Sequence, residues 1–159
     1  MSYVTKILQP NEQIIYSAPI HWVVYLRSIL LLLLAGGFFI GWTVYRPALA
    51  GQPLLDAALI AVAGLLLLAS LYAFIEALIE RRGTELVITN LRVVAKIGFI
   101  RRRTWEINAA KVEGVEVDQS VLGRMLDFGT VTVKGTGGGT APIRNIDDPV
   151  AFRSKVTSL

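Results

Sequence analysis

At 159 residues with 53% hydrophobic side chains and a mean hydropathy of +0.56, the chain is too apolar for an ordinary soluble domain of this size. The net charge of +4 is unevenly placed: residues 1–80 carry three basic and four acidic side chains, whereas residues 81–159 carry thirteen and eight. The absence of cysteine excludes a disulfide framework and thiolate chemistry.

Residues 1–22 are polar, and their apolar run at 13–16 follows turn-forming residues, which favours a strand. The sequence leaves open whether this strand joins the sheet expected later in the chain. His21 is the single histidine and has no acidic or metal-binding neighbour in the sequence. We therefore expect an interfacial aromatic companion of Trp22 and Tyr25 rather than a titratable switch or a ligand.

Two uncharged runs follow, eighteen residues at 28–45 and nineteen at 57–75. A helix of this length spans the hydrocarbon core of ~30 Å. Because lipid offers no partners for backbone N–H and C=O groups, such runs must be helical. The sequence predicts a transmembrane hairpin over residues 23–80, with spans at about 25–45 and 55–76.

Small residues recur four positions apart in both runs, and such faces let helices approach closely in lipid. The candidates for helix packing are Gly37, Gly41, Ala57, Ala61, Ala69 and Ala73. These faces could meet within one hairpin or between copies. An oligomeric channel or carrier is the alternative function they allow, but no charged side chain lies in mid-span to carry ions or protons.

The charges that flank the runs predict the topology. The loop at 46–56 has one arginine, whereas Arg81, Arg82, Arg92 and Lys96 follow the second run closely. By the positive-inside rule both termini are expected in the cytoplasm. The basic domain at 81–159 would then face an anionic inner leaflet, which explains its charge better than nucleic acid does.

From residue 84 the periodicity changes to two. Runs at 84–89, 91–97 and 100–107 predict three successive antiparallel strands, and further strands are expected at 112–119, 129–134 and 140–146. Asp148 before Pro149 predicts the start of an amphipathic helix that buries Phe152 and Val156.

Several segments together resemble the bacterial pleckstrin-homology (PH)-like family of small membrane proteins. They are residues 8–12, 89–93 with Gly98 and Arg101, 123–124, 129–133 and 146–149. The resemblance implies an α+β membrane protein with a PH-like antiparallel β-sandwich or partial barrel, capped by a C-terminal helix, in the bacterial inner membrane. The long basic loop of phosphoinositide-binding relatives has no counterpart here, because Asn90 alone joins the first two of the three strands. Inositide binding is therefore not expected.

No catalytic constellation is visible. The glycine-rich stretch at 135–139 lacks the following helix of a phosphate loop. The carboxylate pairs Glu76 with Glu80 and Asp147 with Asp148 have no third ligand or base beside them. We therefore expect no enzymatic activity, no metal and no cofactor.

The interpretation is an interaction or scaffolding module at the cytoplasmic membrane face, binding a protein partner or its own copies. The turn after the second strand should return to the level of the inner leaflet. The candidates for lipid contact are Arg81, Arg82, Phe99, Ile100, Arg101, Arg102 and Arg103. A solvated, aggregation-resistant strand edge is the alternative explanation of the arginine run.

Overall fold

The computed structural model describes residues 3–49, 51–99, 102–140 and 142–158. It contains two compact units: residues 25–78 form one, which we call the hairpin unit. Residues 1–24 and 79–159 form the other, which we call the β unit. The N-terminal segment thus belongs to the same unit as the C-terminal sheets, a point that the sequence left open.

The hairpin unit consists of two long apolar helices. A 3-10 turn, η1 (Trp22–Tyr25), leads into α2 (Leu26–Tyr45), and η2 (Arg46–Leu49) precedes α3 (Pro53–Gly83). Both helices are long and apolar enough to cross a membrane, over 24 and 31 residues, a test of length and composition alone. Helix α3 continues seven residues beyond the span expected from the sequence. Its last five residues, 79–83, belong to the β unit.

A narrow seam of small side chains joins α2 to α3. Its buried residues are Ser28 and Ala35 on α2, and Ala63, Ser70, Ala73 and Ala77 on α3. These positions follow the three-and-four spacing of a left-handed helix pair. The Ser70 hydroxyl donates to the Ser28 carbonyl at 2.9 Å, and the Trp42 indole donates to Asp56 at 2.6 Å.

Of the six small residues singled out in the sequence, Ala73 lies in this seam. Ala57, Ala61 and Ala69 are exposed on α3. A Cβ added at Gly37 or Gly41 would meet no atom within 4 Å. The helices of the hairpin unit therefore do not approach each other closely at these two glycines. Contact between copies through these positions stays a prediction.

The first sheet of the β unit has the order β1-β2-β3-β4, all antiparallel. Its strands are β1 (Ile14–Ala18), β2 (Glu85–Thr89), β3 (Arg92–Ile97) and β4 (Arg103–Asn108). The two central strands are buried on both faces because α1 (Tyr3–Ile7), a helix the sequence did not predict, covers the side away from the core. There Val4 packs against Val87 and Val94.

The second sheet is built around β6 (Phe128–Gly135), which pairs on one side with β5 (Val112–Asp118). On its other side β6 pairs with β7 (Gly138–Gly139) and β8 (Ile143–Asp147). The short η3 (Ala109–Lys111) precedes β5, and α4 (Val121–Leu126) connects β5 to β6. This α+β arrangement of two antiparallel sheets fits the PH-like fold that was expected.

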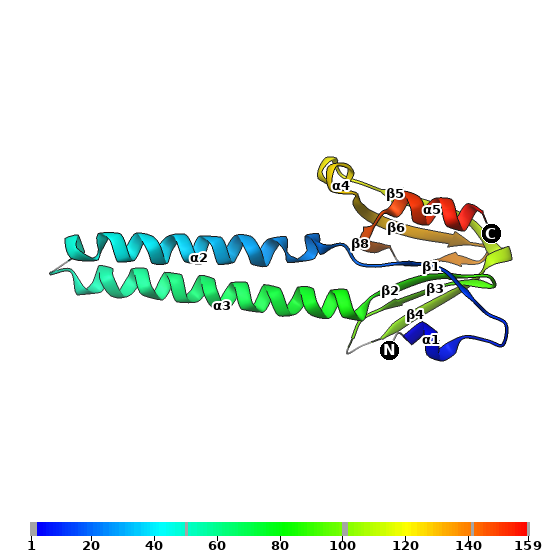
Figure 1. The fold of residues 1–159 in the computed structure, drawn as a ribbon, viewed down its shortest axis with the longest axis horizontal. Helices are drawn as coiled ribbons and strands as arrows, with labels where there is room; N and C mark the ends of the chain where they lie inside the picture. Colours follow the sequence, from blue (N-terminus) through cyan, green and yellow to red (C-terminus); the bar gives the residue numbers. More distant parts are fainter. Residues whose placement is uncertain (1–2, 50, 100–101, 141, 159) are drawn as a thin grey trace. The chain divides into compact units, whose positions relative to one another are not determined.

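Helix α5 (Pro149–Thr157) closes the core of the β unit, and Figure 1 shows it lying along β5 and β6. Phe152 and Val156 are buried among side chains from both sheets, including Leu86, Ile88 and Val131. The expected N-cap is confirmed, because the Asp148 carboxylate accepts from the Ala151 amide at 3.0 Å. The expected strands at 100–107 and 140–146 begin three residues later than predicted.

Candidate functional site

A buried ion pair fastens the N-terminal segment to the first sheet. The guanidinium of Arg92 donates from Nε and Nη2 to the two carboxylate oxygens of Glu12, each at 2.9 Å. The Thr89 hydroxyl and the Gln9 amide each donate to the same carboxylate at 2.8 Å. The Glu12 side chain is 0% exposed, and that of Arg92 is 15% exposed. Four donors therefore compensate the buried negative charge.

These contacts set the ionisation of Glu12. The hydrogen bonds from Arg92 are the largest cause that lowers the pKa of the Glu12 carboxyl from its ordinary 4.5 to about 2, against the opposing effect of burial. The same hydrogen bonds raise the pKa of the Arg92 guanidinium. Both groups are thus charged over the whole neutral range, and the pair is a structural fastening rather than a proton-transfer device.

Asn90 extends this fastening at the turn between β2 and β3. Its side-chain oxygen accepts from the Gln13 amide at 2.9 Å, and its side-chain nitrogen donates to the Asn11 carbonyl at 3.1 Å. Two segments about 80 positions apart, 8–12 and 89–93, are therefore joined by a single network of hydrogen bonds. Their joint appearance in the resemblance has a physical reason, since each supplies the hydrogen-bond partners of the other.

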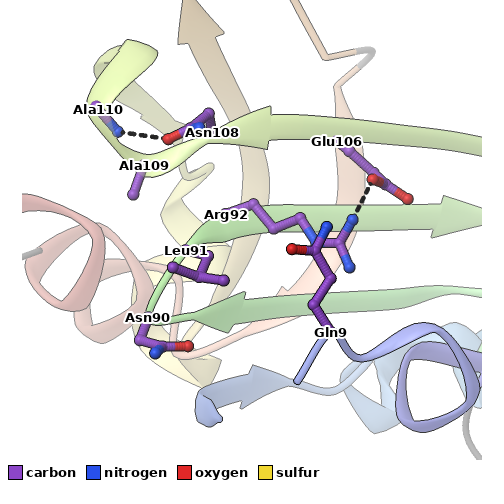
Figure 2. A pocket seen from close by; sticks show the side chains of 8 residues that line it. All are labelled: Gln9, Asn90, Leu91, Arg92, Glu106, Asn108, Ala109 and Ala110. Carbon is purple, nitrogen blue, oxygen red and sulfur yellow. Dashed lines mark hydrogen bonds and ion pairs between the residues drawn. The ribbon is translucent and has the colours of Figure 1, made fainter. Parts of the chain in front are cut away.

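A pocket of ≈ 710 Å³ opens beside this ion pair (Figure 2). Its lining residues are Gln9, Asn90, Leu91, Arg92, Glu106, Asn108, Ala109 and Ala110. On its wall Arg92 Nη1 donates to Glu106 at 2.6 Å, and the Asn108 side chain accepts from the Ala110 amide at 3.1 Å. The side chains of Asn90, Arg92, Glu106 and Asn108 already have hydrogen-bond partners. Among the described residues no three metal-ligating groups gather anywhere. The two charged side chains of this wall, Arg92 and Glu106, are thus paired with each other.

The end of α3 and the turn between β3 and β4 come together within the β unit. A Cβ added to the buried Gly83 would lie 2.8 Å from the Phe99 amide nitrogen and 3.1 Å from the Gly98 carbonyl carbon. The turn therefore returns to the level of Gly83. Arg81 and Arg82 are exposed just before this contact, and Arg102 and Arg103 are exposed just after it.

Phe99 is 56% exposed at the tip of the turn. Ile100 and Arg101, which were expected to contact lipid with it, lie outside the described residues. The other five of the seven candidates thus lie close in the chain to the contact between Gly83 and the turn after β3. Ile97 and Arg103 form the pair of β3 and β4 nearest this turn. Their contact with lipid stays a proposal.

His21 contacts the ring of Trp22, as expected, with ring centroids 5.3 Å apart. It is buried, stacks on Phe128 with ring centroids 5.3 Å apart, and has its Nε2 3.9 Å from Asp147. Its Nδ1 accepts from the Val23 amide at 3.2 Å. The expectation that His21 has no acidic neighbour is wrong, because β8 brings Asp147 to it from a position 126 residues along the chain. Its place at a membrane interface stays a prediction.

Comparison with known proteins gives one match. A family model described as bacterial PH domain matches residues 22–159, which include both apolar helices and all of the β unit except α1 and β1. No curated protein and no solved structure matches the chain. Arg92 thus lies inside the matched range and its partner Glu12 outside it.

Proposed function

The chain belongs to the bacterial PH domain family, and we propose that it is a membrane-anchored interaction module of the cytoplasmic membrane face. In this proposal α2 and α3 span the bacterial inner membrane with both termini in the cytoplasm. The β unit contacts anionic lipid and binds a protein partner or further copies of the chain.

The observation that carries the membrane anchor is the apolar surface that the hairpin unit leaves uncovered. In the most apolar windows of the two helices, only 11% and 17% of the residues are buried. Leucines that point away from the seam, such as Leu33, Leu65 and Leu68, are more than 60% exposed. Soluble proteins rarely leave so much contiguous apolar surface in water, whereas a bilayer covers it at no cost.

The charges at the ends of the hairpin are consistent with this anchor. Arg27 and Glu76 lie 3.6 Å apart at one end of the helix pair. At the other end the Arg46 guanidinium lies over the Trp42 ring, 5.1 Å from its centroid. The charged side chains of both pairs stand outside the uncharged runs, and Trp42 near the end of the first run is where a spanning helix would place an interfacial tryptophan.

The turn between β3 and β4, together with the exposed arginines at residues 81, 82, 102 and 103, supports lipid contact by the β unit. We call this group the basic turn. Arg81 and Arg82 directly precede Gly83, and Arg102 and Arg103 follow the turn that Gly83 contacts. Each basic side chain near an anionic leaflet contributes ~1 kcal/mol. PH domains are generally non-catalytic modules, and the two charged side chains of the pocket, Arg92 and Glu106, are paired with each other. Binding, not turnover, is the activity that the family and the geometry favour.

Topology can be tested with the full chain because it has no native cysteine. Gln52→Cys lies in the loop between the helices, and Ala110→Cys is exposed in η3. A membrane-impermeant maleimide should label the first in intact cells and the second only after lysis. Labelling of both in intact cells, or recovery of the protein without membranes, contradicts the anchor.

Lipid contact can be tested in vesicles with a polarity-sensitive dye on Phe99→Cys. Its emission should shift to the blue in vesicles containing phosphatidylglycerol, and the shift should diminish at high salt. Adding Arg102→Glu and Arg103→Glu should abolish the shift, whereas the charge-conserving lysine pair should keep it. If the emission is the same in neutral vesicles as in anionic ones, the arginines do not bind lipid charge, and the alternative of a solvated strand edge explains them better.

The partner can be sought by crosslinking in native membranes followed by mass spectrometry. A groove of ≈ 500 Å³ on the hairpin unit, lined by Leu33, Leu34, Gly37, Phe38, Gly41, Trp42, Tyr45 and Leu59, favours a second copy among the partners. In that case Gly37→Leu and Gly41→Leu together should remove the crosslinked dimer. Recovery of an isolated monomer alone would contradict the interaction module.

A further inference from the structure

Helix α4 presents an uncovered apolar surface within the β unit. Val121, Leu122, Met125 and Leu126 are between 39% and 76% exposed, although they occupy a helix of only six residues. Scattered single apolar residues on a surface are ordinary, but four on one short connection form a patch. The core of the β unit makes no use of them, since none belongs to a buried cluster.

Contacts with neighbouring residues fix the backbone of α4, and they hold its apolar side chains at the surface. Gly123 is buried, and a Cβ on it would lie 2.6 Å from the Phe128 carbonyl oxygen. The Ser120 hydroxyl caps the helix by accepting from the Gly123 amide at 3.1 Å. The Gln119 side chain donates to the Phe128 carbonyl at 3.2 Å. Six residues would not form a stable helix without such support.

The position of α4 is defined by contacts inside the β unit. Phe128, two residues after α4, stacks on His21, and Trp22 then begins the apolar segment of the chain. Asn145 on β8 joins this point to the end of α3, because its carbonyl accepts from the His21 amide at 2.7 Å and its side chain donates to Glu80 at 3.1 Å. Figure 1 accordingly shows α4 at the end of the β unit where β2 begins. Within the β unit the patch therefore lies on the side of Trp22 and Glu80, close to where the chain passes into residues 25–78.

We propose that α4 inserts Val121, Leu122 and Met125 into the inner leaflet, as a lipid-binding element separate from the basic turn. This inference rests on the proposed membrane anchor. A bilayer surface is the favoured occupant, because the rings of Phe128, His21 and Trp22 connect α4 to the start of the apolar segment. Trp22 is itself 47% exposed there. Amphipathic helices that lie in a membrane interface bury their apolar face ~5–10 Å into the boundary between headgroups and acyl chains, and the exposed side chains of α4 would reach this boundary in the same way.

The contact is apolar rather than electrostatic. Arg124 is the single basic residue of α4, and Asp127, Asp147 and Asp148 stand close to its C-terminal end. The Asp148 amide donates to the Asp127 carbonyl at 3.1 Å, and Asp147 pairs with Phe128 across the sheet. Burial first, and then the charges of these three carboxylates, raise the pKa of Tyr16 beneath them. Salt should therefore leave the contact of α4 intact while it weakens that of the basic turn.

The test uses the full chain in vesicles of phosphatidylcholine and phosphatidylglycerol, with one dye-labelled cysteine at a time. Leu122→Cys reports on α4, Leu68→Cys on the apolar helices, and Ala110→Cys on an exposed position of η3 as the matched control. Lipids with brominated acyl chains quench dyes that touch the bilayer interior. We expect quenching at residues 122 and 68, none at 110, and no change at 122 when salt is raised.

The outcomes separate this inference from the proposed function. Quenching at Leu68→Cys but equal emission at Leu122→Cys and Ala110→Cys would overturn the role of α4 and leave the anchor standing. Absence of quenching at Leu68→Cys would overturn the anchor and the inference together. Protection of Leu122→Cys from iodide without quenching by brominated lipid would mean that a protein surface or a second copy covers α4, which also overturns the inference.

Discussion

Replacing Glu12 by Gln should destabilise the β unit at neutral pH by about 3 kcal/mol. The amide keeps the shape of the carboxylate but loses its charge, and its NH₂ group would face the guanidinium of Arg92. Two N–H···O contacts at 2.9 Å would then be reduced to one at most. Arg92 would keep Glu106 and the Ile7 carbonyl, so its charge would not be left alone.

The magnitude follows from the ionisation of Glu12. Its pKa in the folded chain is about 2, against 4.5 for an unperturbed glutamate. At about 1.4 kcal/mol per pKa unit, this difference corresponds to about 3 kcal/mol of stability. Because the folded pKa is the lower one, that stability is fully present above pH 4.5 and is lost as the pH falls from there toward 2. The variant should lack this part of the pH dependence.

Hydrogen exchange measured by mass spectrometry on the full chain in micelles, over a denaturant series, would report the opening free energy of β2 and β3. Glu116→Gln is the matched control, because its partner Lys134 lies 2.8 Å away but both side chains are about 60% exposed. The control should match the natural chain closely at neutral pH. A loss below about 1 kcal/mol for Glu12→Gln, or an unchanged acid limb in that variant, would refute this account of the ion pair.

Three further substitutions test the packing. Gly123→Ala should raise hydrogen exchange across α4 because its methyl group would collide with a backbone carbonyl, whereas Gly114→Ala, with open space around it, should not. Ala63→Leu should separate the two apolar helices by overfilling their seam, at about 1–3 kcal/mol, and Gly37→Leu should leave them paired in a crosslinking assay on the monomer. Asp148→Ala should lower the unfolding free energy by about 1 kcal/mol in the same exchange experiment, because α5 loses its N-cap.

Local pattern was sufficient for the two long helices and for most of the strands. Uncharged runs of eighteen and nineteen residues have the length and apolarity of α2 and α3, and alternating β-branched residues marked most of the strands. The two short helices α1 and α4 were missed for different reasons. The first has five residues, too few for a helical period to be visible, and the second is held by the buried Gly123 and the side chain of Gln119 rather than by its own propensity.

The candidate site was predicted only in part, because its parts are distant in the chain. The arginines beside Gly83 were found from charge, but Glu12 carries no local sign that it meets Arg92 across 80 positions. The same holds for β1, whose pairing with β2 makes residues 1–24 part of the β unit. A fragment that begins at residue 84 would lack this strand and the ion pair, so the binding tests require the full chain.

What the amino-acid sequence by itself determined is the set of properties that neighbouring residues share: two apolar helices, the basic character of residues 81–159, and strands that alternate in polarity. Hydrophobic length and period are local quantities, and they decide whether a segment can be a helix or a strand. Tertiary structure alone decided which small residues form the seam, that His21 stacks on Phe128, and that the apolar side chains of α4 stay uncovered. Each of these features depends on a contact with a distant segment of the chain. An apolar side chain contributes its free energy of burial only when another surface removes it from water.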